Sequence, residues 1–215
     1  MGGHEHGIKD NEGGMDVIRQ AMNGLLGMAL IASPAVSQGI SSKGEEFLTA
    51  LRESNGSKAL QLIEESDFTI VNHRADDGST ALHVVIRTRN SNWVGFLLSN
   101  GADKDAADKK GDTPLILAAR SGYAEGATRL LMGGAQVDKP NRQGETALIV
   151  AVQQRQASIV STLLKLGANP DNRDHAAGYS ARDYATRDSR TKDMLKLIEM
   201  AKPRASEIAK PAPVR

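Results

Sequence analysis

Residues 111–135 read GDTPLILAARSGYAEGATRLLMGGA, which contains the signals of a short helix–turn–helix unit. Thr113 can accept a hydrogen bond from an otherwise unpaired amide at a helix start, and Pro114 suits the first helical turn, where its missing amide proton costs nothing. Apolar residues three and four positions apart form one stripe on each helix. Gly122 and Gly134 suit the left-handed backbone that ends a helix. The stretch therefore predicts two amphipathic helices joined by a tight turn.

The same signals recur at one constant interval on both sides of this stretch. In the first half of the unit, the repeated positions are Gly78, Gly111 and Gly144, then Thr80, Thr113 and Thr146, then Leu82, Leu115 and Leu148. In the second half they are Leu97, Leu130 and Leu163, then Leu98, Leu131 and Leu164, then Gly101, Gly134 and Gly167, each followed by alanine. Seven positions that keep one period across three units indicate a repeat protein.

Two less regular units flank the three clear ones. Gly178 follows Gly144 by one repeat and a single inserted residue, and Gly44 precedes Gly78 by the same interval. One helix pair cannot bury its apolar stripe alone, so neighbouring pairs must stack to make a continuous core. End units need polar outer faces, and both of these units carry several charged residues. They are therefore predicted to be caps.

The opening Gly-x-Thr-Pro-Leu-His and the closing Leu-Leu-x-x-Gly-Ala of this unit resemble the ankyrin repeat. The best-matching unit reads Gly111-Asp-Thr-Pro-Leu-Ile116 and closes with Leu130–Ala135. The resemblance implies an all-α ankyrin-repeat solenoid of helix–turn–helix units with short hairpin loops, with about five units including the degenerate end caps. The expected unit bounds are 44–75, 76–108, 109–141, 142–175 and 176–200, within a domain at 44–200.

Four positions depart from the ankyrin pattern. Arg89 and Arg155 stand where the family has glycine between the two helices. Ile116 and Ile149 replace the family histidine, which this chain keeps only at His83. We expect longer or more strained turns at the two arginines, no histidine hydrogen bonds at the two isoleucines, and lower stability without a change of fold.

The N-terminal residues 22–37 read MNGLLGMALIASPAVS and have the layout of a bacterial-type secretory signal. Arg19 precedes an apolar run of eight residues, and Ala35 and Ser37 occupy the −3 and −1 positions of a cut before Gln38. A bilayer span needs about 20 apolar residues, so no stable membrane span is expected here. The prediction is a leader and signal peptide at 1–37, a linker at 38–43, and a periplasmic or secreted protein. A cytoplasmic protein, with this run as a helix, is the alternative.

Composition excludes several classes of function. The formal net charge is +1, 3% of residues are aromatic, and cysteine is absent. These values argue against nucleic-acid binding, thiol chemistry and thiolate metal sites. The chain contains no phosphate-binding loop, nucleophile elbow or His-Glu-x-x-His motif. No catalytic residue, metal or cofactor is therefore predicted, and proline-containing residues 201–215 are expected to be a disordered tail.

Ankyrin arrays bind partners through a concave groove lined by hairpin tips and first helices. The matching positions in this chain are polar, lie outside the leucine registers and align from unit to unit. They are Asp76, Asp77, Ser79, Arg87, Thr88, Lys109, Lys110, Asp112, Arg120, Ser121, Arg142, Gln143, Glu145, Gln153, Gln154 and Tyr179. We predict that Arg87, Arg120 and Arg142, roughly one unit apart, form a ladder that grips carboxylates, with Lys109 and Lys110 beside it. The alternative is that these charges only keep the face soluble.

The sequence thus predicts a non-catalytic, monomeric protein–protein interaction module that is exported and binds a protein partner through its concave face. One alternative is a secreted effector that binds a host protein. Others are a membrane-tethered spacer that retains its leader, and an enzyme or metal-binding factor that uses loop residues. The residues do not identify the partner, because one fold serves unrelated functions.

Overall fold

The computed structural model describes residues 34–201, with side chains from residue 42 onward. Contacts divide the chain into two units, residues 1–37 and 38–215. Most of the expected leader and nearly all of the expected tail lie outside the described residues. The helical array belongs to the second unit, apart from the first turn of its opening helix.

Residues 34–201 contain helices and no strand, which confirms the predicted all-α repeat fold. The first pair is α2 (Pro34–Arg52) and α3 (Gly56–Glu65). The following elements are α4 (Ala81–Arg87), α5 (Ser91–Ser99), α6 (Pro114–Ser121), α7 (Ala124–Met132), α8 (Ala147–Gln153), α9 (Ala157–Lys165), α10 (Ala181–Arg187), the short 3₁₀ turn η1 (Ser189–Thr191) and α11 (Lys192–Met200).

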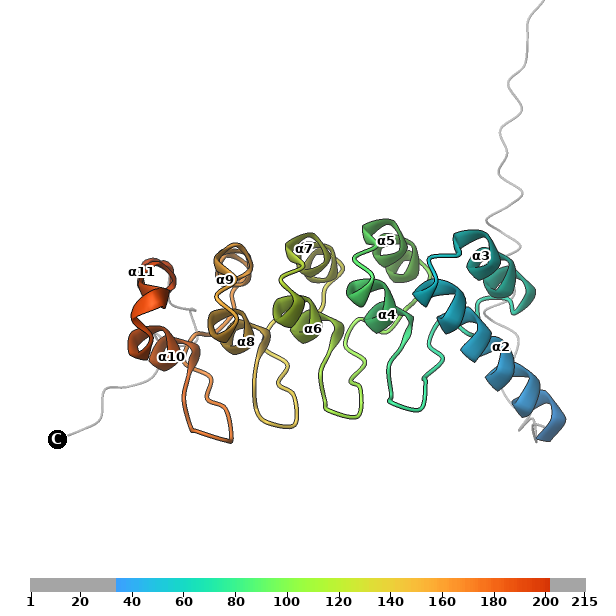
Figure 1. The fold of residues 1–215 in the computed structure, drawn as a ribbon, viewed down its shortest axis with the longest axis horizontal. Coiled ribbons are helices and arrows are strands. Elements are labelled where there is room, and N and C mark those ends of the chain that lie inside the picture. The colour runs from blue at the N-terminus through green and yellow to red at the C-terminus, as the bar shows by residue number, and fades with distance from the viewer. Residues whose placement is uncertain (1–33, 202–215) are drawn as a thin grey trace, which may run out of the picture. The chain divides into compact units, whose positions relative to one another are not determined.

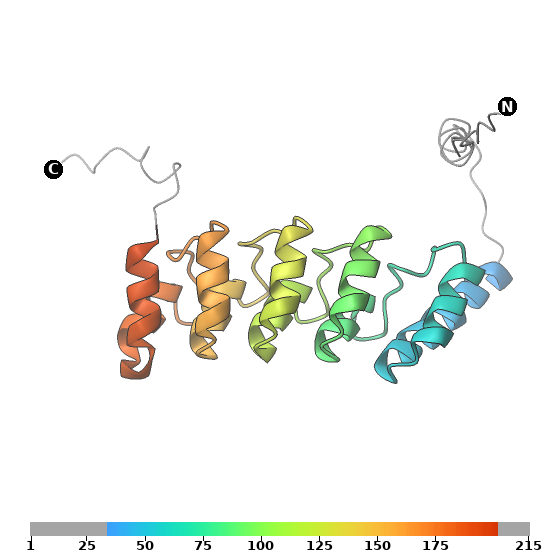
Figure 2. The same cartoon turned by 90° about the horizontal axis from the view of Figure 1, so that it is seen from above.

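The helix pairs stand side by side in a row (Figures 1 and 2). The first helices α4, α6, α8 and α10 pack against one another in one layer, and the second helices α5, α7, α9 and α11 form the other layer. Long loops project from the first-helix layer on the side away from the second helices (Figure 1). Each loop ends in a hairpin before the next first helix.

Apolar side chains make one continuous core along the row. The first helices α4 and α8 are buried almost completely: every residue of α8 from Ala147 to Val152 is at most 1% exposed. The second helices bury one stripe, with Leu97, Leu130 and Leu163 fully buried and their neighbours Leu98, Leu131 and Leu164 only partly buried. The difference arises because a first helix is covered on more sides than a second helix.

Backbone hydrogen bonds join consecutive hairpins. The amide of Lys109 donates to the Asp77 carbonyl at 2.8 Å, that of Arg142 to Lys110 at 3.3 Å, and that of His175 to Gln143 at 2.7 Å. Each hairpin thereby holds the next in register, in addition to the packing of the helices.

Residues 38–43, predicted to be a linker, are helical and lie inside α2. Phe47, Leu48 and Leu51 anchor the later turns of α2 in the core. Once those turns exist, each residue added upstream gains a backbone hydrogen bond at little further cost. Ser37 and Gln38, between which we expect cleavage, also lie in α2.

The two arginines in glycine positions do adopt left-handed backbone, with φ of 54° at Arg89 and 55° at Arg155. Their side chains reach the following repeat. Arg89 donates to the carbonyl of Ser121 at the end of α6, and Arg155 donates to the Asp188 carboxylate at 3.1 and 3.3 Å. The bonds to the next repeat offset some of the backbone strain, an effect that the sequence did not indicate.

His83 links two repeats from a fully buried position. Its Nδ1 accepts a hydrogen bond from the Thr80 amide at 3.2 Å, and its Nε2 donates to the Asp112 carbonyl at 3.0 Å. Ile116 and Ile149 occupy the equivalent buried sites and make no such bonds. Burial lowers the pKa of the His83 imidazole below its ordinary value of 6.5, although the bond to Asp112 opposes this effect.

The His83→Ile variant is expected to lose much of the acid sensitivity of the fold. Because the folded-state pKa lies below the unfolded value of 6.5, the unfolded chain binds more protons, so stability falls as pH drops below that value. Urea unfolding should show a smaller decrease between about pH 7.5 and about pH 5 in the variant than in the wild type. At the higher pH the variant should lose only about 1 kcal/mol. An identical pH dependence in both proteins would contradict this assignment.

Candidate partner-binding surface

A hollow of about 610 Å³ lies between the hairpins and the first helices α4 and α6. We call it the hairpin hollow. Its lining residues are Asp77, Arg87, Asp108, Lys109, Lys110, Asp112, Leu117, Arg120, Gln143 and Glu145. Eight of these ten were among the predicted contact positions. Asp108 and Leu117 were not predicted, because one lies in a loop and the other belongs to an apolar stripe.

Arg120 is held in the hollow by two carboxylates from different repeats. Its Nη2 donates to Asp112 Oδ1 at 3.1 Å and Oδ2 at 3.2 Å, and lies 3.5 Å from Glu145 Oε2. Asn141 Nδ2 completes the group by donating to Asp112 at 2.8 Å and to Glu145 at 2.9 Å. The Asp112 and Glu145 side chains are 6% and 18% exposed, whereas that of Arg120 is 38% exposed. The two largely buried carboxylates therefore fix the position of the more exposed arginine.

Arg87 has a similar but looser arrangement. Its Nη1 donates to Ser79 Oγ at 3.1 Å and lies 3.7 Å from Asp77 Oδ2, while its Nη2 lies 4.0 Å from Asp108 Oδ2. Asp77 also accepts hydrogen bonds from the Ser79 amide and hydroxyl, each at 2.8 Å. Partial burial raises the pKa of the Asp77 carboxyl, but these bonds outweigh it, and the pKa lies below its ordinary value. Asp77 is therefore ionised at neutral pH.

The side chains of Ser79 and Asp112 are buried. They are 0% and 4% exposed and bond to the two arginines. Their contact with a partner stays a prediction, and in the structure they hold Arg87 and Arg120 in place. A spacing in the sequence could have indicated these contacts. Ser79 and Asp112 each precede their arginine by eight residues, which places both members of each pair on one side of the unit.

The three arginines of the predicted ladder do not occupy equivalent positions in their repeats. Arg87 and Arg120 are one full repeat apart and lie in the last turns of equivalent helices, but Arg142 follows Arg120 by less than a repeat and lies in a hairpin. Gln153, at the end of α8, occupies the position equivalent to Arg87 and Arg120. The third equivalent position at the helix ends therefore carries the neutral amide of Gln153.

Three cations project from neighbouring hairpins. Lys109, Lys110 and Arg142 are exposed, and among residues 42–201 their side chains have no hydrogen bond or ion pair. We call them the hairpin cations. The preceding hairpin carries Asp76 and Asp77, both exposed. Charge along the hairpin tips thus changes from negative to positive in the direction of the chain.

The remaining predicted positions lie at the ends of the first helices and in the last hairpin. Thr88 and Ser121 donate their hydroxyls to carbonyls of their own helices, at 3.2 and 3.3 Å. Gln154 is exposed at the end of α8. Tyr179 packs edge-on against Tyr184 with ring centroids 5.6 Å apart, and the Arg187 guanidinium lies 4.4 Å from its ring centroid. Tyr179 therefore extends the face past α8 with an aromatic surface.

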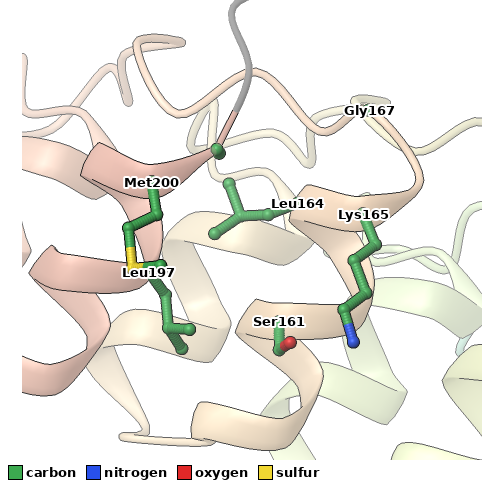
Figure 3. A pocket seen from close by; sticks show the side chains of 7 residues that line it. Ser161, Leu164, Lys165, Gly167, Leu197 and Met200 are labelled. Atoms are coloured by element: carbon green, nitrogen blue, oxygen red, sulfur yellow. The ribbon is translucent and has the colours of Figure 1, made fainter.

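A second, apolar hollow of about 410 Å³ lies between α9 and α11, in the other helix layer. Leu164, Leu197 and Met200 give it an apolar wall, and Lys165 stands at one side (Figure 3). None of the predicted contact residues lines it. Its shape depends on how α11 packs against α9, which the repeat pattern did not indicate.

The described part of the chain holds no cluster of three or more histidine, aspartate or glutamate residues that could bind a metal. Both ring nitrogens of His83 are occupied by structural hydrogen bonds. None of the helices within residues 34–201 has the length and apolar character to cross a membrane. In the hairpin hollow, largely buried carboxylates lie next to more exposed arginines.

A row of stacked helix pairs whose repeats are joined by hairpin loops defines the class of helical repeat proteins. The family model for ankyrin repeats (3 copies) matches residues 47–141 and 108–174, more than half of the chain. The chain therefore belongs to the ankyrin-repeat family. Repeats of this family are protein–protein interaction modules and are generally non-catalytic.

Two curated proteins are similar to this chain over shorter stretches. The chain is 35% identical over 82 residues to the putative ankyrin repeat protein L271 of Acanthamoeba polyphaga mimivirus, a match that covers 37% of this chain and 11% of that protein. It is 36% identical over 74 residues to the potassium channel AKT3 of Oryza sativa subsp. japonica, a match that covers 29% of this chain and 8% of that protein. The chain thus matches about a tenth of each relative's length, and the similarity supports the repeat alone.

Proposed function

We propose that this protein is an exported, non-catalytic interaction module that binds a partner protein in the hairpin hollow. The observation that carries the proposal is the pairing of Arg120 with Asp112 and Glu145, which holds a partly exposed guanidinium in one orientation before any partner arrives. A binding group that is already ordered loses little entropy on association. The hollow also spans hairpins from three consecutive repeats, so one partner segment can contact several of them.

Export is proposed on the pattern of residues 22–37, with cleavage between Ser37 and Gln38. The lack of cysteine suits a compartment in which thiols would be oxidised. In this proposal the partner is a protein of the periplasm or the extracellular medium. A host protein recovered as the partner would favour the secreted-effector version.

Site-specific cross-linking tests the proposed face. A photoreactive phenylalanine analogue is placed at Gln143, an exposed lining residue of the hollow, or at Glu125, which is exposed on α7 in the other layer. We expect the tagged full-length protein, irradiated in the cells that make it, to form a protein adduct from position 143 and not from position 125.

Adducts from position 125 alone would contradict binding through the hollow. Mass spectrometry of the same material reads the mature N-terminus. A start at Gln38 supports export, whereas a retained leader in the cytoplasm contradicts export and leaves the interaction to be judged from the adducts.

A further inference from the structure

We propose that the segment bound in the hairpin hollow is acidic, with carboxylates that meet the hairpin cations and Arg120, and an apolar side chain that meets Leu117. The inference rests on the proposed binding face and adds the chemical class of the partner. It depends on which charges in the hollow are accessible, since acidic and basic lining residues are equal in number.

The acidic side chains of the hollow are mostly shielded. Asp108 and Asp112 have side chains 8% and 6% exposed, and Glu145 is 18% exposed. Each lies beneath an arginine of the hollow. The guanidiniums above them are 44% exposed at Arg87 and 38% exposed at Arg120. Over most of the hollow, the charged groups that a partner can contact are therefore cationic.

Arg120 retains donors for a partner. Its bonds to Asp112 and Glu145 all use Nη2, and within the described residues Nε and Nη1 have no acceptor. Guanidinium binds a carboxylate best when two N–H groups point in parallel, so the remaining nitrogens of a fixed arginine suit this contact. The buried carboxylates fix the Arg120 side chain through Nη2 and leave its other N–H groups available to a partner.

The hairpin cations add charge that nothing in residues 42–201 neutralises. The hydrogen bond from the Arg142 amide to the Lys110 carbonyl, at 3.3 Å, holds their two hairpins together. At the preceding hairpin, Asp76 and Asp77 would repel a carboxylate. The acidic part of the partner therefore lies over the hairpins at 109–112 and 142–145. The part of the partner that lies over Asp76 is neutral or basic.

A peptide fits this surface better than a nucleic acid. Leu117 and Gln143 in the lining offer contacts for an apolar side chain and for a peptide group. A phosphate chain would carry negative charge along its whole length and meet Asp76 and Asp77. The net charge of +1 also provides little of the counterion release on which nucleic-acid binding depends.

Fluorescence polarisation with a charge series of peptides tests the proposal on the full chain. The probes are labelled peptides of about 12 residues, each with a central Leu, in which flanking Glu is replaced stepwise by Gln and then by Lys. Single-stranded oligodeoxythymidine is the nucleic-acid probe. The test variant combines Lys109→Glu, Lys110→Glu and Arg142→Glu. The matched control combines Lys58→Glu, Lys165→Glu and Lys192→Glu, the same charge change on the exposed surface of α3, α9 and α11.

We expect affinity to rise with the Glu content of the probe and to weaken as salt is raised from about 50 to about 300 mM. The hairpin variant should bind the Glu-rich peptide at least about tenfold more weakly, and the control within about twofold of wild type. Equal binding of Glu and Gln peptides, equal loss in both variants, tighter binding of DNA, or no binding of any peptide would overturn the proposal. In each of these cases, adducts from position 143 would still leave the hollow as the interaction face.

Discussion

Phe47→Ala is expected to lower the free energy of unfolding by about 3–5 kcal/mol, because it leaves a cavity in a well-packed core. Phe47 is 0% exposed, and its ring lies edge-on to Trp93 with centroids 6.3 Å apart. Trp93 in turn contacts Phe96 at 5.1 Å. These three rings join the first helix pair to α5. In a linear array, loss of an end unit exposes the core of its neighbour, so the effect should not stay local.

The chain contains one tryptophan, so fluorescence reports directly on this contact. In Phe47→Ala, we expect emission from Trp93 to shift to longer wavelength and urea unfolding to begin at lower concentration. Phe68→Ala is the matched control, because Phe68 is 39% exposed. It should cost less than about 1 kcal/mol. Equal destabilisation by the two substitutions would show that the aromatic contact does not anchor the first pair.

Gly111→Ala is expected to destabilise the protein by about 2–3 kcal/mol, for two separate reasons. Gly111 has φ of 83°, a left-handed conformation that costs a residue with a Cβ about 1–2 kcal/mol. A Cβ there would also lie 2.6 Å from the Arg142 amide nitrogen. The next hairpin would have to move, which would break the hydrogen bond from Arg142 to Lys110, worth about 1 kcal/mol.

Gly101→Ala separates the two reasons. Gly101 has φ of 78°, but no heavy atom lies within 4 Å of the position of its Cβ. In this variant the free energy of unfolding should fall by only about 1–2 kcal/mol, the cost of placing a Cβ in left-handed backbone. Circular dichroism during urea unfolding measures both variants. A loss as large at Gly101 as at Gly111 would mean that the close approach of the hairpins contributes nothing to stability.

The repeat pattern was sufficient to predict the fold. Thr113 and Thr146 cap their helices by accepting bonds from Ile116 and Ile149, as their positions before the leucine stripes indicated. Gly122 ends α6 in left-handed backbone with φ of 68°. Such signals involve residues within one or two turns of each other, so they can be interpreted without knowledge of the rest of the chain.

The candidate site was predicted less completely. Most of the residues that line the hollow were among the predicted positions, because the repeat places equivalent residues on one face. The roles of these residues could not be predicted from the sequence. Ser79 and Asp112 have polar side chains that are typical of a surface, yet both are buried beneath arginines. Arg142 was placed with Arg87 and Arg120 on residue type, although only the latter two share a register. Whether a charge is paired depends on groups far away along the chain.

The amino-acid pattern alone specified the family, the helix pairs, the capping residues and the face on which binding is proposed, because each of these follows from local spacing. Tertiary structure decided which charges neutralise one another, where the first helix begins, and how consecutive hairpins are joined. Glu145 lies 25 residues from Arg120 along the chain and becomes its partner only when two repeats stack. Stacking therefore converts a row of polar residues into a hollow with buried carboxylates and exposed cations.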